Sequence, residues 1–187
     1  MITSTPEQKK RAFVLINELE EAWEVALAEA SQRAQSAGRA DVARYLELRR
    51  RNDLLRRTAI DWLNGTFTAL VADANRLNAG IQIERHENHR FRRGPATMVG
   101  TQLTFRRGVR TLTIESGWPR TPRDGIVRGD GLACANIKHL GRARTNDELV
   151  LLRSKTDSPQ WFVLKDDERA LLNDSFLRRH ISLFTQS

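Results

Sequence analysis

Apolar residues recur at helical spacing through the first 80 residues of the chain. One series runs as follows: Ile16, Leu19, Trp23, Ala26, Ala30, Ala34 and Ala37. A second continues at compatible spacing: Leu48, Leu55, Ala59, Trp62, Leu63, Leu70, Ala74 and Leu77. Such spacing places side chains on one face of an α-helix. Because Gly38 separates the two series and Gly80 ends the second, we expect two long helices packed as an antiparallel hairpin.

After Gly80 the helical spacing gives way to short β-branched stretches separated by glycines and prolines. This pattern predicts strands near residues 81–85, 97–105, 109–116, 132–139, 148–153 and 161–164. The segment Arg106-Arg107-Gly108 predicts a tight hairpin turn, with the glycine supplying the unusual backbone angle. Arginines at the tip of such a turn are expected to be exposed.

The end of the chain predicts one more helix, with acidic residues from Asp166 to Glu168 at its start and basic residues before His180 at its end. The sequence therefore predicts an α+β fold. A long antiparallel helical hairpin, residues 1–80, precedes a small antiparallel sheet of about five to six strands covered by a C-terminal helix, residues 81–187.

Positive charge is concentrated in one part of the chain. The formal net charge is +8, from 31 lysines and arginines against 23 acidic residues, and residues 81–130 hold ten positive and five negative groups. The single cysteine, Cys134, lies in an apolar context and is expected to be a buried small hydrophobe. With no run of apolar residues long enough to span a membrane and no signal sequence, we expect a soluble, cytoplasmic protein without a membrane partner.

The arginines of the sheet portion are the candidate binding residues. Arginine matches phosphate and carboxylate groups bidentately, and neutralising nucleic-acid phosphates releases counterions. The set expected to contact an anionic partner or nucleic acid is Arg90, Arg92, Arg93, Arg106, Arg107, Arg110, Arg120, Arg123, Arg128 and Trp118. For the segment 117–131 a second reading stays open, namely a proline-stiffened crossover that packs Trp118 on the sheet.

Sequence motifs for cofactor binding, metal binding and catalysis are weak in this chain. The glycines of residues 117–131 fit neither the dinucleotide fingerprint nor the Walker loop, so no cofactor is expected. The group from Glu84 to His89 holds possible metal ligands, but a solvated strand end is the preferred interpretation and no metal is expected. No catalytic residue is assigned, and an enzyme is the minority hypothesis.

Three functions follow in order of preference. The first is a non-catalytic binding module for an anionic partner, nucleic acid foremost, through arginines of the sheet portion. The second is a structural or adaptor protein that forms a homodimer, or docks a partner, through the helical hairpin. The third is an enzyme acting on a phosphorylated or carboxylated small molecule at the 117–131 loop, which requires arginines of that loop to converge with His139 or an acid.

Overall fold

The computed structural model describes residues 6–127, 129–154, 158–165 and 168–186, with side chains described from residue 21 onward except that of Pro122. The chain divides into two compact units, residues 1–54 and 55–187. This division falls earlier than the 80/81 boundary expected from the sequence, because the second half of the second helix packs with the sheet.

The first unit is a helical hairpin. Helix α1 spans Pro6–Ser36 and helix α2 spans Ala40–Arg76, so the first unit contains α1 and the beginning of α2. Gly38 makes the turn with a φ of +70°, a backbone conformation that glycine adopts without steric cost. Near the turn, Ala34 and Ala43 are buried, since small side chains let two helices approach closely. The expected helical N-terminal region is confirmed.

The second unit contains an antiparallel sheet in which each strand pairs with the next along the chain. Its strands are β1 Gln82–Arg93, β2 Ala96–Arg107, β3 Arg110–Trp118, β4 Ala133–His139, β5 Asp147–Arg153, β6 Pro159–Lys165 and β7 Glu168–Leu171. The α+β class is confirmed, but the sheet has seven strands rather than the expected five to six. No helix among the residues that the structure describes is long and apolar enough to cross a membrane.

The additional strand corrects the expected start of the last helix. Glu168 begins β7 instead of a helix, while Asp166 and Asp167 lie outside the described residues. Helix α3 spans Asp174–Thr185, and the side chain of Asn173 caps it by accepting a hydrogen bond from the Phe176 amide at 2.9 Å. The acidic run favours a helix start only weakly, so strand pairing with β6 prevails over it.

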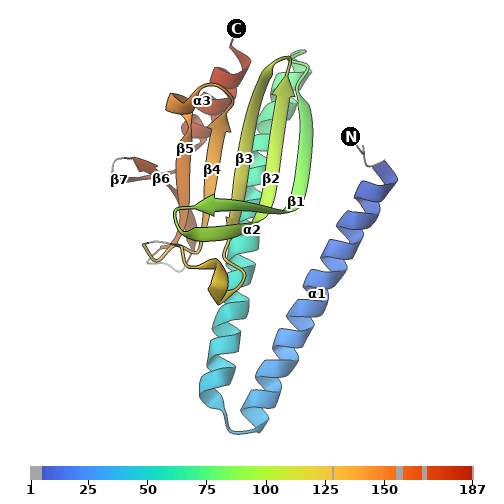
Figure 1. Ribbon diagram of the computed structural model, residues 1–187, viewed down its shortest axis with the longest axis vertical. Helices are drawn as coiled ribbons and strands as arrows, with labels where there is room; N and C mark the ends of the chain where they lie inside the picture. The colour runs from blue at the N-terminus through green and yellow to red at the C-terminus, as the bar shows by residue number, and fades with distance from the viewer. Residues whose placement is uncertain (1–5, 128, 155–157, 166–167, 187) are drawn as a thin grey trace. The chain divides into compact units, whose positions relative to one another are not determined.

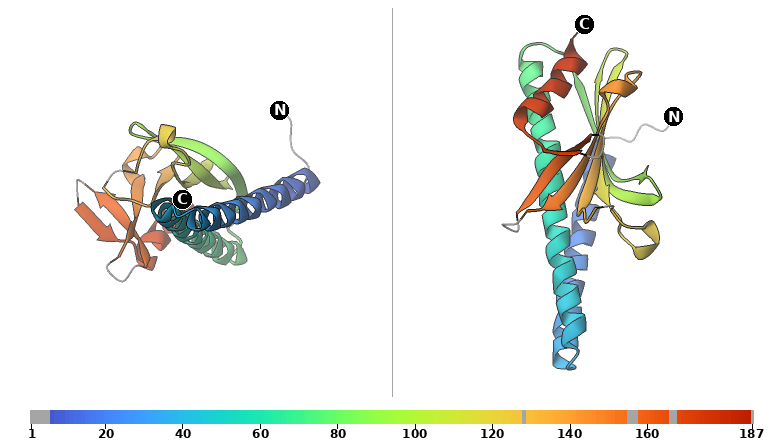
Figure 2. Two further views of the ribbon diagram at one scale, coloured as in Figure 1. Left: turned by 90° about the horizontal axis from the view of Figure 1, so that it is seen from below. Right: turned by 90° about the vertical axis from the view of Figure 1, so that its left-hand side faces the viewer.

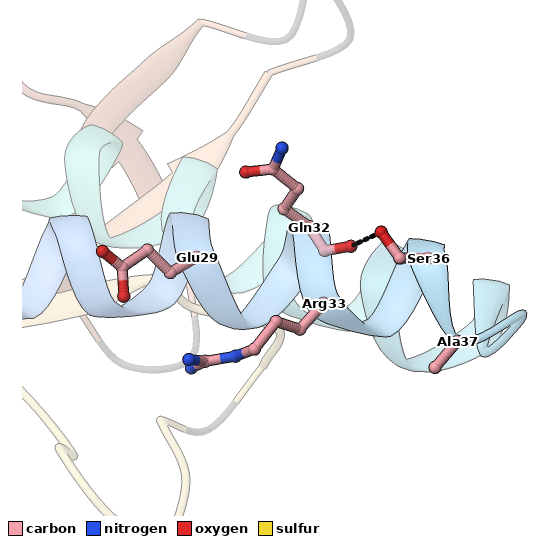
Figure 3. Close-up of a pocket in the computed structure, with 5 residues that line it drawn as sticks. All are labelled: Glu29, Gln32, Arg33, Ser36 and Ala37. Carbon is pink, nitrogen blue, oxygen red and sulfur yellow. Dashed lines mark hydrogen bonds between the residues drawn. The ribbon is translucent and has the colours of Figure 1, made fainter.

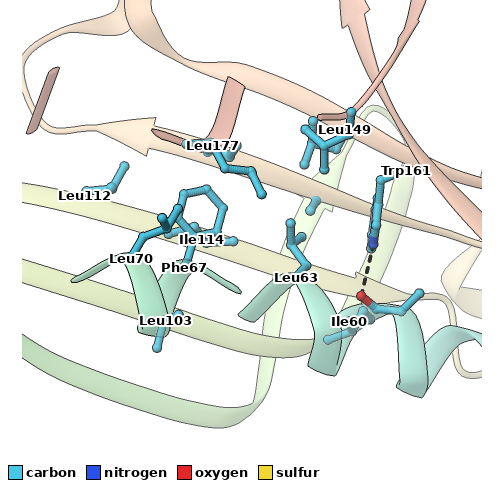
Figure 4. Packing of buried hydrophobic residues seen from close by; sticks show 14 of the residues in the cluster. Ile60, Leu63, Phe67, Leu70, Leu103, Leu112, Ile114, Leu149, Trp161 and Leu177 are labelled. Atoms are coloured by element: carbon cyan, nitrogen blue, oxygen red, sulfur yellow. Dashed lines mark hydrogen bonds between the residues drawn. The ribbon is translucent and has the colours of Figure 1, made fainter. Parts of the chain in front are cut away.

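The main core lies between one face of the sheet and the helices that cover it. Figure 2 shows the second half of α2 and the whole of α3 on the same side of the sheet. Phe67, Phe105 and Leu177 are fully enclosed there, and Figure 4 shows their neighbours. The Trp161 indole donates a hydrogen bond to the Ala59 carbonyl at 3.0 Å, which fixes β6 against α2.

The sheet bends sharply near the turn that joins β1 to β2. A β-bulge interrupts β1 between His86 and His89, and Asn88 adopts a φ of +56°. Gly100 pairs with Gly117 at the same level, where the backbones of β2 and β3 approach too closely for a side chain. The end of the β1–β2 hairpin therefore turns across the other strands (Figure 1).

A second, smaller apolar cluster forms beneath the bent hairpin. Phe91, Ala96, Met98 and Cys134 are buried together, so the expected burial of the single cysteine is confirmed. Burial also raises the pKa of the Cys134 thiol, and a raised pKa keeps it in the less reactive thiol form. This cluster holds the hairpin in the position that the candidate site requires.

Candidate anion-binding surface

The bent hairpin brings arginines of β1 next to the loop that follows β3. Arg90 and Arg92 lie on the same face of β1, because side chains alternate along a strand. Arg90 pairs with Val99 of β2, and Val99 pairs with Trp118 of β3. This row places Arg90 two strands away from Trp118, and the Arg120 guanidinium lies over the Trp118 ring at 3.6 Å from its centroid.

A short 3-10 helix, η1 (Pro122–Asp124), brings Arg123 to the same place. Asp124 accepts hydrogen bonds from the Thr121 amide at 2.9 Å and the Thr121 hydroxyl at 2.8 Å, and it pairs with Arg90 at 3.2 Å. The Thr121 hydrogen bonds lower the pKa of Asp124, which stays ionised and tethers the loop to β1. Gly125 then packs directly against Ala96 of β2.

Arg90, Arg92, Arg120 and Arg123 thus form what we call the hairpin–loop basic surface. Arg92 and Arg123 are exposed, and neither makes an ion pair with any residue that the structure describes. Asp124 offsets one of the four charges, so the surface retains positive charge that exposed guanidinium groups can direct at an anion.

Trp118 packs inside the protein and is not available to a ligand. It is buried, with the Arg120 guanidinium on its ring and that of Arg56 at 6.0 Å from the ring centroid. Arg56 also donates a hydrogen bond to the Leu132 carbonyl at 2.7 Å, which ties α2 to the loop end. The indole therefore offers no free face for a base, and its packing matches the interpretation of residues 117–131 as a crossover that packs Trp118 on the sheet.

Other arginines of the expected set lie outside this surface. Arg93 donates to the Leu149 carbonyl at 2.9 Å and pairs with Glu148 at 3.1 Å, so it fastens the bent hairpin to β5. Arg106 is exposed beside Glu84 at 3.6 Å, near the turn between β2 and β3. Arg128 lies outside the described residues.

The remaining two arginines hold the end of α3. Gly108 opens the two-residue turn with a φ of +57°, as expected, but Arg107 and Arg110 are only partly exposed. Arg107 donates to the Thr185 carbonyl and Arg110 to the Phe184 carbonyl, while Arg142 reaches the Leu183 carbonyl at 3.1 Å. Carbonyls of a helix's last turn lack partners within the helix and carry partial negative charge, so arginines stabilise them. The expectation that Arg107 is freely exposed at the tip is wrong for this reason.

This arrangement predicts unequal effects of two neighbouring arginine substitutions. Arg107→Ala should lower the free energy of unfolding by about 1 to 2 kcal/mol, because it removes a charge-assisted hydrogen bond at the α3 terminus. Arg106→Ala, its exposed neighbour, should change the free energy of unfolding by less than about 0.5 kcal/mol. Urea unfolding of both variants measures the difference, and equal effects would contradict the role assigned to Arg107.

A buried carboxylate lies on the sheet face under the bend. Glu115 accepts hydrogen bonds from Lys138 at 2.6 Å and Asn136 at 3.3 Å, and its other oxygen lies 3.0 Å from His89 Nε2. Burial alone would raise the pKa of Glu115, but the bonds from Lys138, His89 and Asn136 outweigh burial and lower it. All its oxygens thus have partners, so this cluster stabilises the bend. The sequence carries no signal for it, because the cluster depends on strand register.

A second buried polar cluster lies between the sheet and α3. His139 Nε2 is 2.9 Å from His180 Nδ1, and His180 Nε2 lies 3.2 Å from Asp147 Oδ2 without the alignment of a hydrogen bond. Arg179 pairs with Asp147 at 3.0 Å. Burial lowers the pKa of His139 and lowers that of His180 to about 3, so both imidazoles are neutral near pH 7.

The histidine cluster and the loop arginines are far apart. His139 pairs with Leu112 at one end of β3, whereas Arg120 stacks on Trp118 at the other end, about 20 Å away at 3.3 Å per residue. The convergence that the enzyme hypothesis requires is therefore not seen for His139 with Arg120 or Arg123. Within the described part of the chain, no three histidine, cysteine, aspartate or glutamate side chains are grouped to hold a metal ion.

The first unit has a shallow depression of a different kind. It is lined by Glu29, Gln32, Arg33 and Ser36 of α1 and by Ala37, the residue after its end (Figure 3). Ser36 donates to the Gln32 carbonyl at 3.0 Å, and neither Glu29 nor Arg33 makes an ion pair with any residue that the structure describes. This polar face has no converging groups that would define a site.

No family model, no curated protein and no solved structure matches this chain.

Proposed function

We propose that the protein is a non-catalytic module that binds nucleic acid through the hairpin–loop basic surface. The observation that carries this proposal is the Arg90–Asp124 ion pair, which joins the part of β1 that carries Arg90 and Arg92 to the loop that carries Arg120 and Arg123. Segments about 30 residues apart in sequence supply the four guanidinium groups. Arginine binds phosphate in a fixed, bidentate geometry, which suits a polymer with regularly spaced phosphates.

Two features support phosphate as the ligand group. Arg120 is held on the Trp118 ring, so part of the conformational entropy lost on binding is already lost in the free protein. The Arg90–Asp124 pair and the Thr121 bonds keep the loop close to β1. The surface therefore presents its charges in a defined arrangement before the partner arrives.

The same geometry predicts little sequence preference. Trp118 is buried and the Arg120 guanidinium lies over its ring, so it does not stack on a base. Contacts from arginines to phosphates position a protein on nucleic acid without reading the bases. We therefore expect affinity to depend on salt concentration and hardly at all on base sequence.

Arg92→Ala combined with Arg123→Ala should weaken binding to mixed-sequence oligonucleotides and make the slope of log affinity against log salt shallower by about two. Both side chains are exposed, so the double variant should retain the wild-type free energy of unfolding. Fluorescence anisotropy with single- and double-stranded oligonucleotides across a salt series measures both quantities.

The matched control removes two arginines elsewhere in the second unit. Arg144→Ala with Arg178→Ala lowers the net charge equally, in the short 3-10 helix η2 (Ala143–Thr145) that follows β4 and on the surface of α3. This control should keep most of the wild-type affinity and salt slope. If wild-type protein fails to bind either oligonucleotide at low salt, or if both double variants weaken binding equally, the proposed function is wrong.

A further inference from the structure

We propose that the helical hairpin of the first unit is a self-association surface, and that two copies of the chain pair their hairpins into a four-helix arrangement. This inference is independent of nucleic-acid binding. It rests on apolar side chains that the hairpin leaves exposed on its inward-facing stripes, and on the distribution of charge between its two helices.

Within the described side chains of the first unit, few apolar residues of the two helices are buried. Leu27, Ala34 and Ala43 are buried, and the Ser31 hydroxyl donates to the Ala43 carbonyl at 3.4 Å. Trp23 lies eleven residues before Ala34, and Leu54 lies eleven residues after Ala43. Eleven residues are three helical turns, so each of the two shares a stripe with the buried alanine of its own helix.

Yet Trp23 is 47% exposed and Leu54 is 58% exposed. They lie about 16 Å from the alanine contact along their helices, at 1.5 Å per residue. Arg49 covers part of the Trp23 ring, with its guanidinium 5.5 Å from the ring centroid. The inward stripes are therefore only partly buried in one copy.

The distribution of charge favours a second copy of the chain as the partner that covers these stripes. Residues 12–32 of α1 carry five glutamates and no lysine or arginine. Residues 44–51 of α2 carry four arginines and one glutamate. In a two-fold dimer the same surface is used twice, so the acidic helix of each copy lies against the basic helix of the other. A hairpin with one acidic segment and one basic segment is thus complementary to a second copy of itself.

The opposite face of α1 is suited to solvent. Glu29, Gln32, Arg33 and Ser36 line it, and all are exposed (Figure 3). A four-helix arrangement buries the inward stripes and leaves such polar faces outside. The proposed dimer thereby encloses Trp23 and Leu54 without enclosing unpaired charge.

The first test compares two substitutions of exposed apolar residues. Multi-angle light scattering of the full chain from about 1 to 100 µM should show a dimer. Leu54→Glu should shift the dimerisation constant by about tenfold or more toward monomer. Val109→Glu, at a 93% exposed position in the β2–β3 turn, is the control and should remain dimeric. Monomeric wild-type protein at 100 µM, or a dimer unaffected by Leu54→Glu, would overturn the proposal.

The second test uses complementary charge reversal. One chain carries Glu21→Arg and Glu24→Arg on α1, and the other carries Arg50→Glu and Arg51→Glu on α2. Each should be monomeric alone, because the reversal halves the charge difference between residues 12–32 and residues 44–51 from eight (−5 against +3) to four, and an equimolar mixture should form the mixed dimer. Circular dichroism checks that each variant stays helical. If the folded variants dimerise alone, or if their mixture stays monomeric, the assignment of the surface is wrong.

Discussion

Gly100→Ala should destabilise the second unit by about 3 kcal/mol or more, because the backbone has no room for a methyl group there. A Cβ at this position would lie 2.0 Å from the Ser116 carbonyl oxygen and 2.6 Å from the Gly117 Cα. Both are backbone atoms of β3, so relief requires the strands to move apart where the sheet bends. Urea unfolding followed by tryptophan fluorescence measures the loss.

Gly65→Ala is the matched control for this substitution. Gly65 lies inside α2, and a Cβ there meets no atom within 4 Å. Alanine favours a helix interior over glycine by about 1 kcal/mol, so this variant should be more stable than wild type. If Gly100→Ala unfolds at the wild-type urea concentration, the close approach of β2 and β3 is not as described.

Acidification should destabilise the second unit through the histidines under α3. Burial lowers the pKa of His180 to about 3, against about 6.5 for an unperturbed histidine. Below about pH 6.5, His180 therefore binds a proton in the unfolded chain but stays neutral in the folded chain. The free energy of unfolding falls as pH falls. His180 alone should account for about 2 kcal/mol between pH 7.5 and pH 5.

Two neighbours of His180 change the pH dependence of the free energy of unfolding in opposite directions. The pKa of His139 is also lowered by burial, which adds to the loss in acid. Burial raises the pKa of Asp147, so its protonation favours the folded state and offsets part of the loss at the acidic end. Urea unfolding at several pH values should show a flatter profile for His180→Gln than for wild type. A wild-type profile flat from pH 7.5 to 5 would refute the assignment.

Local features were predictable where a few adjacent residues decide the structure. The stripes of α1 and α2, the turn at Gly38 and the turn at Gly108 follow from spacing and from the left-handed conformation that glycine tolerates. Most strands were found, but β7 was not, because Glu168–Leu171 is short, exposed on every residue and preceded by acidic residues that favour a helix start.

For the arginines of the candidate site, too, the sequence predicted some properties and the structure was needed for others. A binding role for arginines of residues 90–128 was predicted from the excess of positive charge, and it stays a prediction. Arg92 and Arg107 look alike in sequence, yet Arg92 is exposed on the hairpin and Arg107 holds the end of α3. The difference arises from a helix end 78 residues away from Arg107.

The sequence by itself determined the α+β class, the helical N-terminal region, the β2–β3 turn and the burial of Cys134, because each depends on side-chain periodicity or on one backbone conformation. Only the tertiary structure decided that β1 and β2 bend at Gly100, that Glu115 is enclosed by His89 and Lys138, and that Arg107 binds α3. These features are contacts between segments distant in sequence. Strand register and packing determine them, and the conformational preferences of neighbouring residues do not specify them.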